Sequence, residues 1–166
     1  VRSFPPVENS RARILILGSM PGLASLRAGQ YYAHPQNQFW PIVCGLLGFS
    51  EVPAYAARVR LLLVNRIALW DVFESCVRAG SLDSAIRDRT AAVNDFAAFF
   101  RAHPDVSRVL FNGAKAEAAW RSKVLPALGA AHAGLEILRL PSTSPAHAVI
   151  GLAQKRRAWK AGLALN

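Results

Sequence analysis

The chain is 166 residues long and 52% hydrophobic, and its 20 Lys and Arg residues against 10 Asp and Glu give a formal net charge of +10. This size suits one domain with a sizeable core and excludes two ordinary domains, and no apolar run reaches the roughly 18 residues that cross a membrane, so we expect the chain to be neither membrane-spanning nor secreted. The positive charge favours a polyanionic partner such as nucleic acid, with a membrane surface as the alternative.

Four short apolar runs separated by helical patterns predict an α/β fold. Strands rich in leucine and β-branched residues are expected at Arg13–Gly18, Arg66–Val72, Val106–Asn112 and Glu136–Leu140. Apolar residues at spacings of three and four predict helices at Asn37–Leu47, Ala54–Leu63, Asn94–His103, Ala114–Leu125 and, as one or two short pieces, Ala146–Leu165. This alternation predicts a three-layer α/β/α sandwich around a central, mainly parallel four-stranded sheet, with ligand sites at the carboxyl ends of its strands.

The segments that follow the strands are expected to share one rim, formed by Gly18–Pro21, Asp71–Val72, Asn112–Gly113 and Pro141–Pro145. The first belongs to the turn GSMPG, where two glycines and a proline let backbone amides approach a ligand closely. This turn lacks the GxGxxG and GxxxxGKS/T patterns of nucleotide-binding loops, so taken alone it predicts only a turn. Asp71, within LWDV, is interpreted as a helix cap.

Aromatic residues are concentrated in YYAHPQNQFW, just before and inside the first predicted helix. Phe39 and Trp40 lie on the apolar face of that helix and are assigned to the core. Tyr31 and Tyr32 lie in the preceding loop, where we expect an aromatic ring to meet a ligand, and stacking on a nucleobase suits them. Asn37 fits two roles equally well, a helix N-cap worth about 1 kcal/mol and a catalytic amide.

Two further polar segments end strands. The Asn112 amide can hydrogen-bond a base edge, although an Asn-Gly turn explains the residue equally well. The stretch PSTSPAH, residues 141–147, carries hydroxyls and free amides that fit phosphate contacts, with a capped helix start as the alternative. His34 and His147, each near a proline, are assigned structural roles.

Signatures of metal or nucleophilic chemistry are missing from the sequence. Cys44 and Cys76 are far apart, with no CxxC spacing and no clustered histidines, so we expect buried thiols in a reducing compartment and no metal site. No GxSxG motif occurs and paired carboxylates are scarce. The rim is therefore expected to work through amides and hydroxyls, without a cofactor.

Five segments in this order, GSMPG, YYAHPQNQFW, LWDV, FNG and PSTSPAHA, together resemble the uracil-DNA glycosylase superfamily, specifically its hypoxanthine-DNA (deoxyinosine) glycosylase branch. The resemblance spans Arg13 to His147. It implies a monofunctional DNA glycosylase that flips a deaminated base, hypoxanthine above all, out of double-stranded DNA and removes it in base excision repair. We expect a cofactor-free monomer in the cytoplasm of a bacterium, held at the nucleoid by DNA binding.

The resemblance also implies how the substrate is held. Gly18, Ser19 and Met20 correspond to the turn that embraces the extruded base, and Tyr32 to the aromatic residue that stacks on it, with Phe39 as a further substrate-binding residue. Met20 stands where related uracil enzymes carry Asn or Asp to position the attacking water. A thioether is a poor acceptor and no donor, so Met20 cannot hold that water.

In the branch that the chain resembles, an Asn that matches Asn37 positions the water instead, which makes Asn37 and the base-reading Asn112 the expected catalytic residues. Leu140 replaces the His or Asn that contacts the leaving group in uracil enzymes, which argues against efficient uracil excision. DNA contacts are expected from the loop that matches the superfamily's second motif and from two neighbouring side chains, namely Ser142, Thr143, Ser144, Pro145, His147 and Lys115.

Three alternatives stay open. The same fold could excise uracil, xanthine or 5-hydroxymethyluracil in place of hypoxanthine. The chain could instead be a non-catalytic nucleic-acid-binding module, which would bind DNA in a salt-dependent way and release no base. A small-nucleotide hydrolase would act on free nucleosides.

Overall fold

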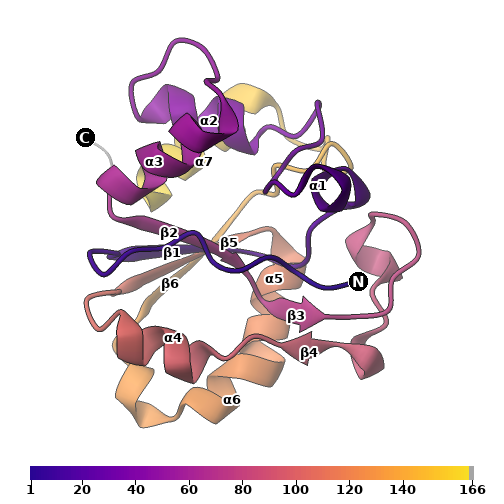
Figure 1. Cartoon of the computed structure of the whole chain (residues 1–166), viewed down its shortest axis with the longest axis vertical. Coiled ribbons are helices and arrows are strands. Elements are labelled where there is room, and N and C mark those ends of the chain that lie inside the picture. Colours follow the sequence, from indigo (N-terminus) through magenta and orange to yellow (C-terminus); the bar gives the residue numbers. More distant parts are fainter. Residues whose placement is uncertain (165–166) are drawn as a thin grey trace.

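A four-stranded parallel sheet forms the middle layer of the computed structural model, which describes residues 1–164 (Figure 1). The strands lie in the order β2-β1-β5-β6 and comprise β1 (Ile14–Gly18), β2 (Ile67–Asp71), β5 (Arg108–Asn112) and β6 (Glu136–Leu140). β1, β2 and β5 are buried along almost their whole length, as expected for continuous apolar runs in a sheet covered on both faces. The predicted fold class is confirmed, and each strand lies at or near its predicted bounds.

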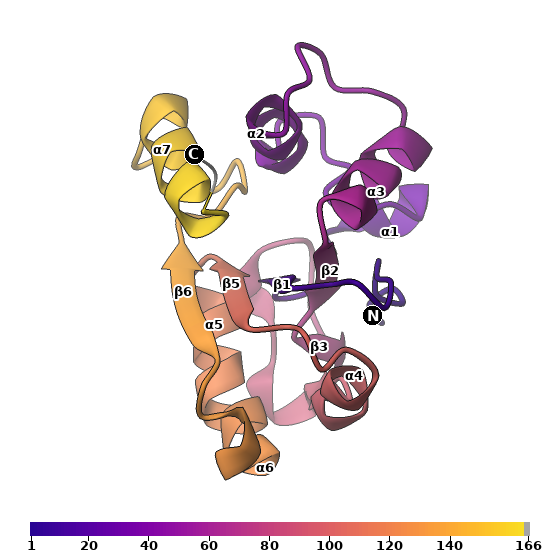
Figure 2. The same ribbon diagram turned by 90° about the vertical axis from the view of Figure 1, so that its left-hand side faces the viewer.

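Helices cover both faces of the sheet (Figure 2). One layer holds α1 (Leu23–Ala28), α2 (Phe39–Leu46), α3 (Tyr55–Val64) and α7 (Leu152–Gly162), and the other holds α4 (Phe96–Ala102), α5 (Ala114–Ala119) and α6 (Leu125–Leu128). Short 3-10 turns occur at Asp83–Ala85, Asp88–Thr90 and Ala130–His132. None of the helices within residues 1–164 has the length and apolar character needed to cross a bilayer.

The structure departs from the predicted elements where local geometry overrides the apolar pattern. The helix predicted at Ala114–Leu125 is divided, because Trp120–Val124 forms a π-helical turn between α5 and α6. The last helix begins only at Leu152, since residues 146–151 form an irregular loop, and Leu165 lies outside the described residues. The hairpin of β3 (Phe73–Ser75) and β4 (Ala92–Val93), like α1, is too short to give a periodic signal.

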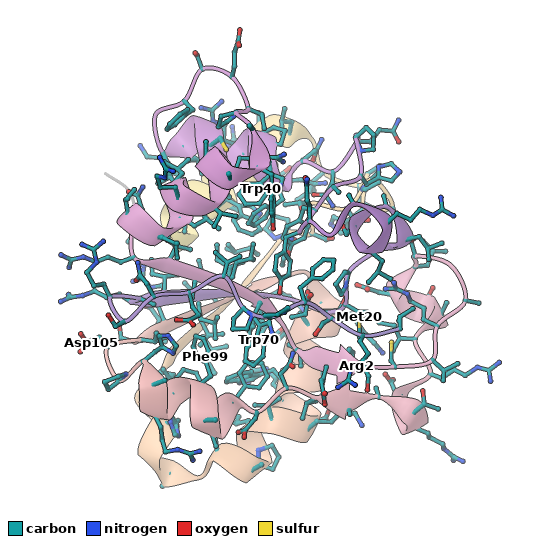
Figure 3. The ribbon with its side chains drawn as sticks, in the orientation of Figure 1. Arg2, Met20, Trp40, Trp70, Phe99 and Asp105 are labelled. Atoms are coloured by element: carbon teal, nitrogen blue, oxygen red, sulfur yellow. The ribbon has the colours of Figure 1, made fainter. Side chains whose placement is uncertain are left out.

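Aromatic side chains fill the core on both sides of the sheet. Trp40 lies on the side of α2, whereas Trp70 and Phe99 pack together on the side of α4, with ring centroids 5.6 Å apart (Figure 3). Phe39 contacts both Trp40 and Trp159 edge-on, which joins α2 to α7. The assignment of Phe39 and Trp40 to the core is confirmed, since they are 0% and 2% exposed. The two cysteines, Cys44 and Cys76, are free and buried, as predicted.

Candidate active site

The turn after β1, the loop before α2, the end of β2 and the segments after β5 and β6 together line a cleft of about 540 Å³. Parallel strands place their carboxyl ends on one side of a sheet, which explains why segments so distant in sequence meet here. Every site residue predicted from the sequence except Phe39 lines this cleft: Gly18, Ser19, Met20, Tyr32, Asn37, Asn112, Lys115, Ser142, Thr143, Ser144, Pro145 and His147.

The first turn is held by side chains from the segment after β3. The guanidinium of Arg78, itself buried, donates hydrogen bonds to the backbone carbonyls of Met20 and Pro21, and the Ser19 hydroxyl donates to the Asp83 carboxylate. Met20 is 6% exposed and offers only its thioether. The turn therefore has a fixed shape, and at position 20 its side chain provides no group that could hold a water molecule for attack.

Gly18 is required for steric reasons. It pairs in register with Asp71 on the neighbouring strand, so both residues face the same side of the sheet. A Cβ atom at position 18 would overlap Asp71 Oδ1 and would lie 2.9 Å from Tyr32 Oη. Because the residue is a glycine, two polar side chains from distant segments can occupy the same place. We call Gly18, Tyr32 and Asp71 the cleft floor.

Tyr32 has an unusual backbone and an unpartnered hydroxyl. Its φ of 53° lies in the left-handed region, which non-glycine residues rarely occupy and which is concentrated at functional sites. One face of the ring stacks on Phe39, with centroids 4.1 Å apart and planes inclined by 23°. The hydroxyl is buried without a hydrogen-bond partner among residues 1–164. Burial, and after it the Asp71 carboxyl, raises its pKa, whereas the neighbouring Asn112 side chain lowers it. Phe39 thus lies behind Tyr32, outside the cleft lining, and supports its ring.

The neighbouring Tyr31 corrects a sequence prediction. We expected both tyrosines to meet a ligand, but Tyr31 is 3% exposed and its hydroxyl donates to the backbone carbonyl of Pro5 at 3.2 Å. Its own carbonyl accepts a hydrogen bond from Trp40 Nε1 at 2.7 Å. Tyr31 therefore borders the cleft as a buried residue whose polar groups are already bonded within the protein.

Asn37 lies half-buried at the cleft, directly before α2. Its Oδ1 accepts a hydrogen bond from the Phe39 backbone N–H at 2.9 Å, which is an Asx turn one residue before Gln38, the N-cap of α2. Within the described residues its side-chain nitrogen has no acceptor, and Oδ1 keeps a second lone pair. The predicted N-cap role therefore belongs to the next residue, and the Asx turn fixes the Asn37 side chain while leaving donor and acceptor capacity for a ligand.

Asn112 is used differently. Its Nδ2 donates to Thr143 Oγ1 and its Oδ1 accepts from the Thr143 backbone N–H, both at 2.9 Å. Thr143 is 0% exposed, so the prediction that its side chain contacts DNA does not hold, and it fixes Asn112 instead. One N–H and one lone pair of the Asn112 amide remain available to a ligand.

Two side chains of α7 hold the loop after β6 through hydrogen bonds to its backbone carbonyls. Lys155, which is 2% exposed, donates from Nζ to the His147 carbonyl at 2.7 Å, and Trp159 Nε1 donates to the Pro141 carbonyl at 3.1 Å. Burial lowers the pKa of Lys155. We call Asn112, Thr143 and the loop that Lys155 holds the braced wall. Ser144 is half-buried on this loop and Pro145 is exposed, so the loop presents a stiff edge to solvent.

Asp71 is the residue that the sequence interpretation missed. It ends β2 and caps no helix; its side chain is 3% exposed and lines the cleft. Its Oδ2 is buried without a partner in the described part of the chain, and burial, with the Asp83 carboxylate adding to it, raises the pKa to about 8. The available signal was its position as a carboxylate that ends a buried strand on the predicted rim.

Two remaining predictions concern charge and metal. Lys115 lines the cleft and forms an ion pair with Asp88 at 2.6 Å, so any DNA contact that it makes competes with this pair. Residues 1–164 bring no group of three or more His, Cys, Asp or Glu side chains together in a way that could hold a metal ion.

Comparisons with known proteins identify the family of the chain and relatives with a similar fold. The family model described as "Uracil DNA glycosylase superfamily" matches residues 5–162. Two relatives named "Hypoxanthine DNA glycosylase", from Methanosarcina barkeri and Methanosarcina acetivorans, are 41% and 42% identical over 115 and 116 residues, which is 69% of this chain and 72% of each relative. The solution NMR structure of a Methanosarcina acetivorans protein provisionally named a uracil DNA glycosylase superposes with a TM-score of 0.79 at 37% identity, covering 98% of this chain and 95% of that one.

Proposed function

Because this chain belongs to the uracil DNA glycosylase superfamily, we propose that it is a DNA glycosylase whose substrate is hypoxanthine, the base of deoxyinosine, in double-stranded DNA. In this proposal it acts as a monomer in base excision repair. The name shared by the two archaeal relatives supports hypoxanthine as the base. The observation that carries the proposal is the half-buried Asn37, which opens into the same cleft as Tyr32 and Asn112.

Hydrolysis of an N-glycosidic bond passes through an oxocarbenium-like sugar, and water then attacks the anomeric carbon. Asn37 is proposed to position this water through the free hydrogen-bonding capacity of its amide. The Asn112 amide, fixed by Thr143, is proposed to bind the base edge with its remaining N–H. The free face of the Tyr32 ring is proposed to stack on the flipped base, with Phe39 supporting the ring from behind.

The last residue of β6, Leu140, supports hypoxanthine over uracil as the substrate base. Leu140 is only 6% exposed. A Cβ atom placed on Gly162, in α7, would lie only 2.9 Å from Leu140 Cδ2. Its side chain therefore packs toward α7 and does not line the cleft. No polar contact to a departing uracil can come from this position.

DNA binding is proposed to use the stiff edge of the loop after β6, with Ser142, Ser144 and Pro145 against the minor groove, while His147 and basic side chains such as Lys115 approach the backbone. The net charge of +10 supports a polyanionic partner. Flipping requires a few kcal/mol, and less where the base is mispaired, so a mispaired inosine is favoured over a normal pair.

A panel of duplexes, each carrying one inosine, uracil, xanthine or 5-hydroxymethyluracil, tests this proposal. With the protein in excess, alkali cleavage at abasic sites should reveal the largest single-turnover rate for inosine. A preference for uracil would contradict the argument from Leu140. Salt-dependent binding without release of any base would identify a binding module, and turnover of free deoxyinosine with no effect of duplex would identify a nucleoside hydrolase.

A further inference from the structure

The cleft floor holds two buried polar atoms without partners, although most buried polar atoms in proteins are hydrogen-bonded. Tyr32 Oη and Asp71 Oδ2 are both shielded from solvent, and neither has a hydrogen-bond partner among residues 1–164. They come from the loop before α2 and from the end of β2, so two separate segments bring unsatisfied groups to one place. An unsatisfied pair in a ligand-sized cleft points to groups that a ligand completes.

The surrounding chain is shaped to admit these groups. Any side chain at Gly18 would overlap Asp71 Oδ1 and crowd Tyr32 Oη, and Tyr32 adopts a left-handed backbone to reach this position. The Asn94 side-chain amide donates to the Asp71 backbone carbonyl at 2.8 Å, which fixes the end of β2 without using the carboxyl. The carboxyl is therefore positioned by its neighbours and left without a hydrogen bond from them.

Burial favours the neutral form of the Asp71 carboxyl. Burial and, after it, the Asp83 carboxylate raise its pKa, and the Arg78 guanidinium lowers it. The net pKa of Asp71 is about 8. Arg78 is itself bonded to the carbonyls of the first turn, and Asp83 to the Ser19 hydroxyl, so neither forms an ion pair with Asp71. Tyr32 and Tyr31, which also interact with the Asp71 carboxyl, both have raised pKa values and stay protonated. At neutral pH the Asp71 carboxyl carries a proton that it can donate.

We propose that Asp71 is a further catalytic residue of the cleft, whose carboxyl hydrogen-bonds the flipped purine and gives its proton to the base as the glycosidic bond breaks; this inference rests on the function proposed above. It replaces the expectation that the rim works through amides and hydroxyls alone. A buried carboxyl held neutral beside its substrate is a recurrent form of general acid.

The step balances as follows in atoms and electrons. The bond between C1′ and the purine nitrogen breaks, and both of its electrons go to the base. The Asp71 proton passes to a ring nitrogen, so hypoxanthine leaves neutral. A water oxygen, positioned by Asn37, bonds to C1′ and releases one proton to solvent, and the Asp71 carboxylate regains a proton from solvent.

Single-turnover excision from an inosine duplex, measured from pH 6 to 10, tests this role. The wild-type rate should be level in the lower part of the range and fall about tenfold per pH unit above pH 8, as the carboxyl loses its proton. Asp71→Asn should lower the rate at pH 7 roughly 10²–10⁴-fold and abolish this pH dependence, because an amide cannot transfer a proton. Asp105→Asn is the matched control and should behave as wild type, since Asp105 is exposed and lies at the opposite end of the molecule from Met20 (Figure 3).

A second measurement reports on the carboxyl without catalysis. The side-chain carboxyl ¹³C resonance of Asp71 in the wild-type protein should titrate near pH 8. Titration near pH 4, where free aspartate titrates, would overturn the inference even if Asp71→Asn fails to fold. An active wild type whose rate and pH profile are unchanged by Asp71→Asn would overturn it while leaving the proposed function intact. A wild type that releases no base from any lesion would overturn the proposed function itself, and this role with it.

Discussion

Two sides of one cleft treat their polar groups in opposite ways. On the braced wall, the Asn112 amide is held by two hydrogen bonds to Thr143, and the buried Lys155 is bonded to the His147 carbonyl. On the cleft floor, Tyr32 Oη and Asp71 Oδ2 are equally shielded and have no partner in the described residues. The polar groups on the two sides are similarly buried, but those of the braced wall have hydrogen-bond partners and those of the cleft floor have none in the described residues.

This difference separates support from chemistry. A satisfied buried network rigidifies the surface that it carries, whereas an unsatisfied buried group destabilises the fold and is retained where a ligand completes it. Substitutions on the braced wall should therefore lower stability first, and removal of the unpartnered polar groups of Tyr32 and Asp71 should lower activity while stability is kept or increased.

Gly18→Ala is expected to lower stability and activity together. Its methyl group would overlap the Asp71 carboxyl and crowd the Tyr32 hydroxyl, so the floor must shift. Overpacking of this kind costs about 1–3 kcal/mol of unfolding free energy, and displacement of reacting groups by about 1 Å lowers rates roughly 100-fold. Thermal unfolding and single-turnover excision measure the two effects. Gly134→Ala is the matched control, because nothing lies within 4 Å of its added methyl; equal behaviour of the two variants would contradict the steric role of Gly18.

Thr143→Val tests the braced wall. Valine keeps the shape of threonine but removes the acceptor of the Asn112 Nδ2 bond, leaving a buried donor unsatisfied. The expected loss is about 1–3 kcal/mol in denaturant unfolding, with Thr143→Ser close to wild type because it restores the hydroxyl. A Thr143→Val protein of unchanged stability would show that the hydrogen bond from Asn112 to Thr143 does not stabilise the fold.

Asp71→Asn should change stability in the opposite direction. The folded-state pKa of about 8 lies above the unfolded value, so the contribution of Asp71 to stability is full below pH 4 and is lost as pH rises toward 8. The variant should therefore gain on wild type as pH rises from 4 to 8, by at most about 5 kcal/mol for a shift of this size. Melting temperatures of variant and wild type from pH 4 to pH 9 measure this difference. A variant that becomes less stable relative to wild type as pH rises would contradict the raised pKa of Asp71.

The smallest effect is expected from Asp83→Asn. Removing this carboxylate takes away one of the causes that raise the pKa of Asp71, so the fall in excision rate should begin at a lower pH than in wild type. We expect a displacement of less than about one pH unit, because burial is the larger cause. A displacement to higher pH would show that Asp83 does not act on Asp71 through its charge.

The sequence was sufficient to predict the sheet and most of the segments that meet at the cleft, although not the segment that contains Asp83. Continuous apolar runs located four parallel strands, and because such strands end on one side, Asn112 and the residues of the first turn could be placed together from the sequence alone. The boundaries that failed, such as the start of α7 at Leu152, depend on loop packing that no periodic pattern records.

The roles of neighbouring residues could not be predicted in the same way. Tyr31 and Tyr32 are adjacent and chemically identical, and both border the cleft. The Tyr31 hydroxyl is bonded to the Pro5 carbonyl, whereas the hydroxyl of Tyr32, which has a positive φ, is buried without a partner in the described residues. Asp71 is flanked by Trp70 and Val72 and looks like any polar residue at a strand end. Whether its carboxyl finds a partner depends on Gly18, Arg78 and Asp83, which only the tertiary structure brings near it.

The central claim is that an amide in this cleft directs water at a flipped purine nucleotide. Single-turnover excision of hypoxanthine by Asn37→Ala, with DNA affinity measured in parallel, tests it most directly. The account predicts a rate lowered roughly 100-fold or more with nearly unchanged affinity for the duplex. An excision rate equal to that of the wild type would contradict it.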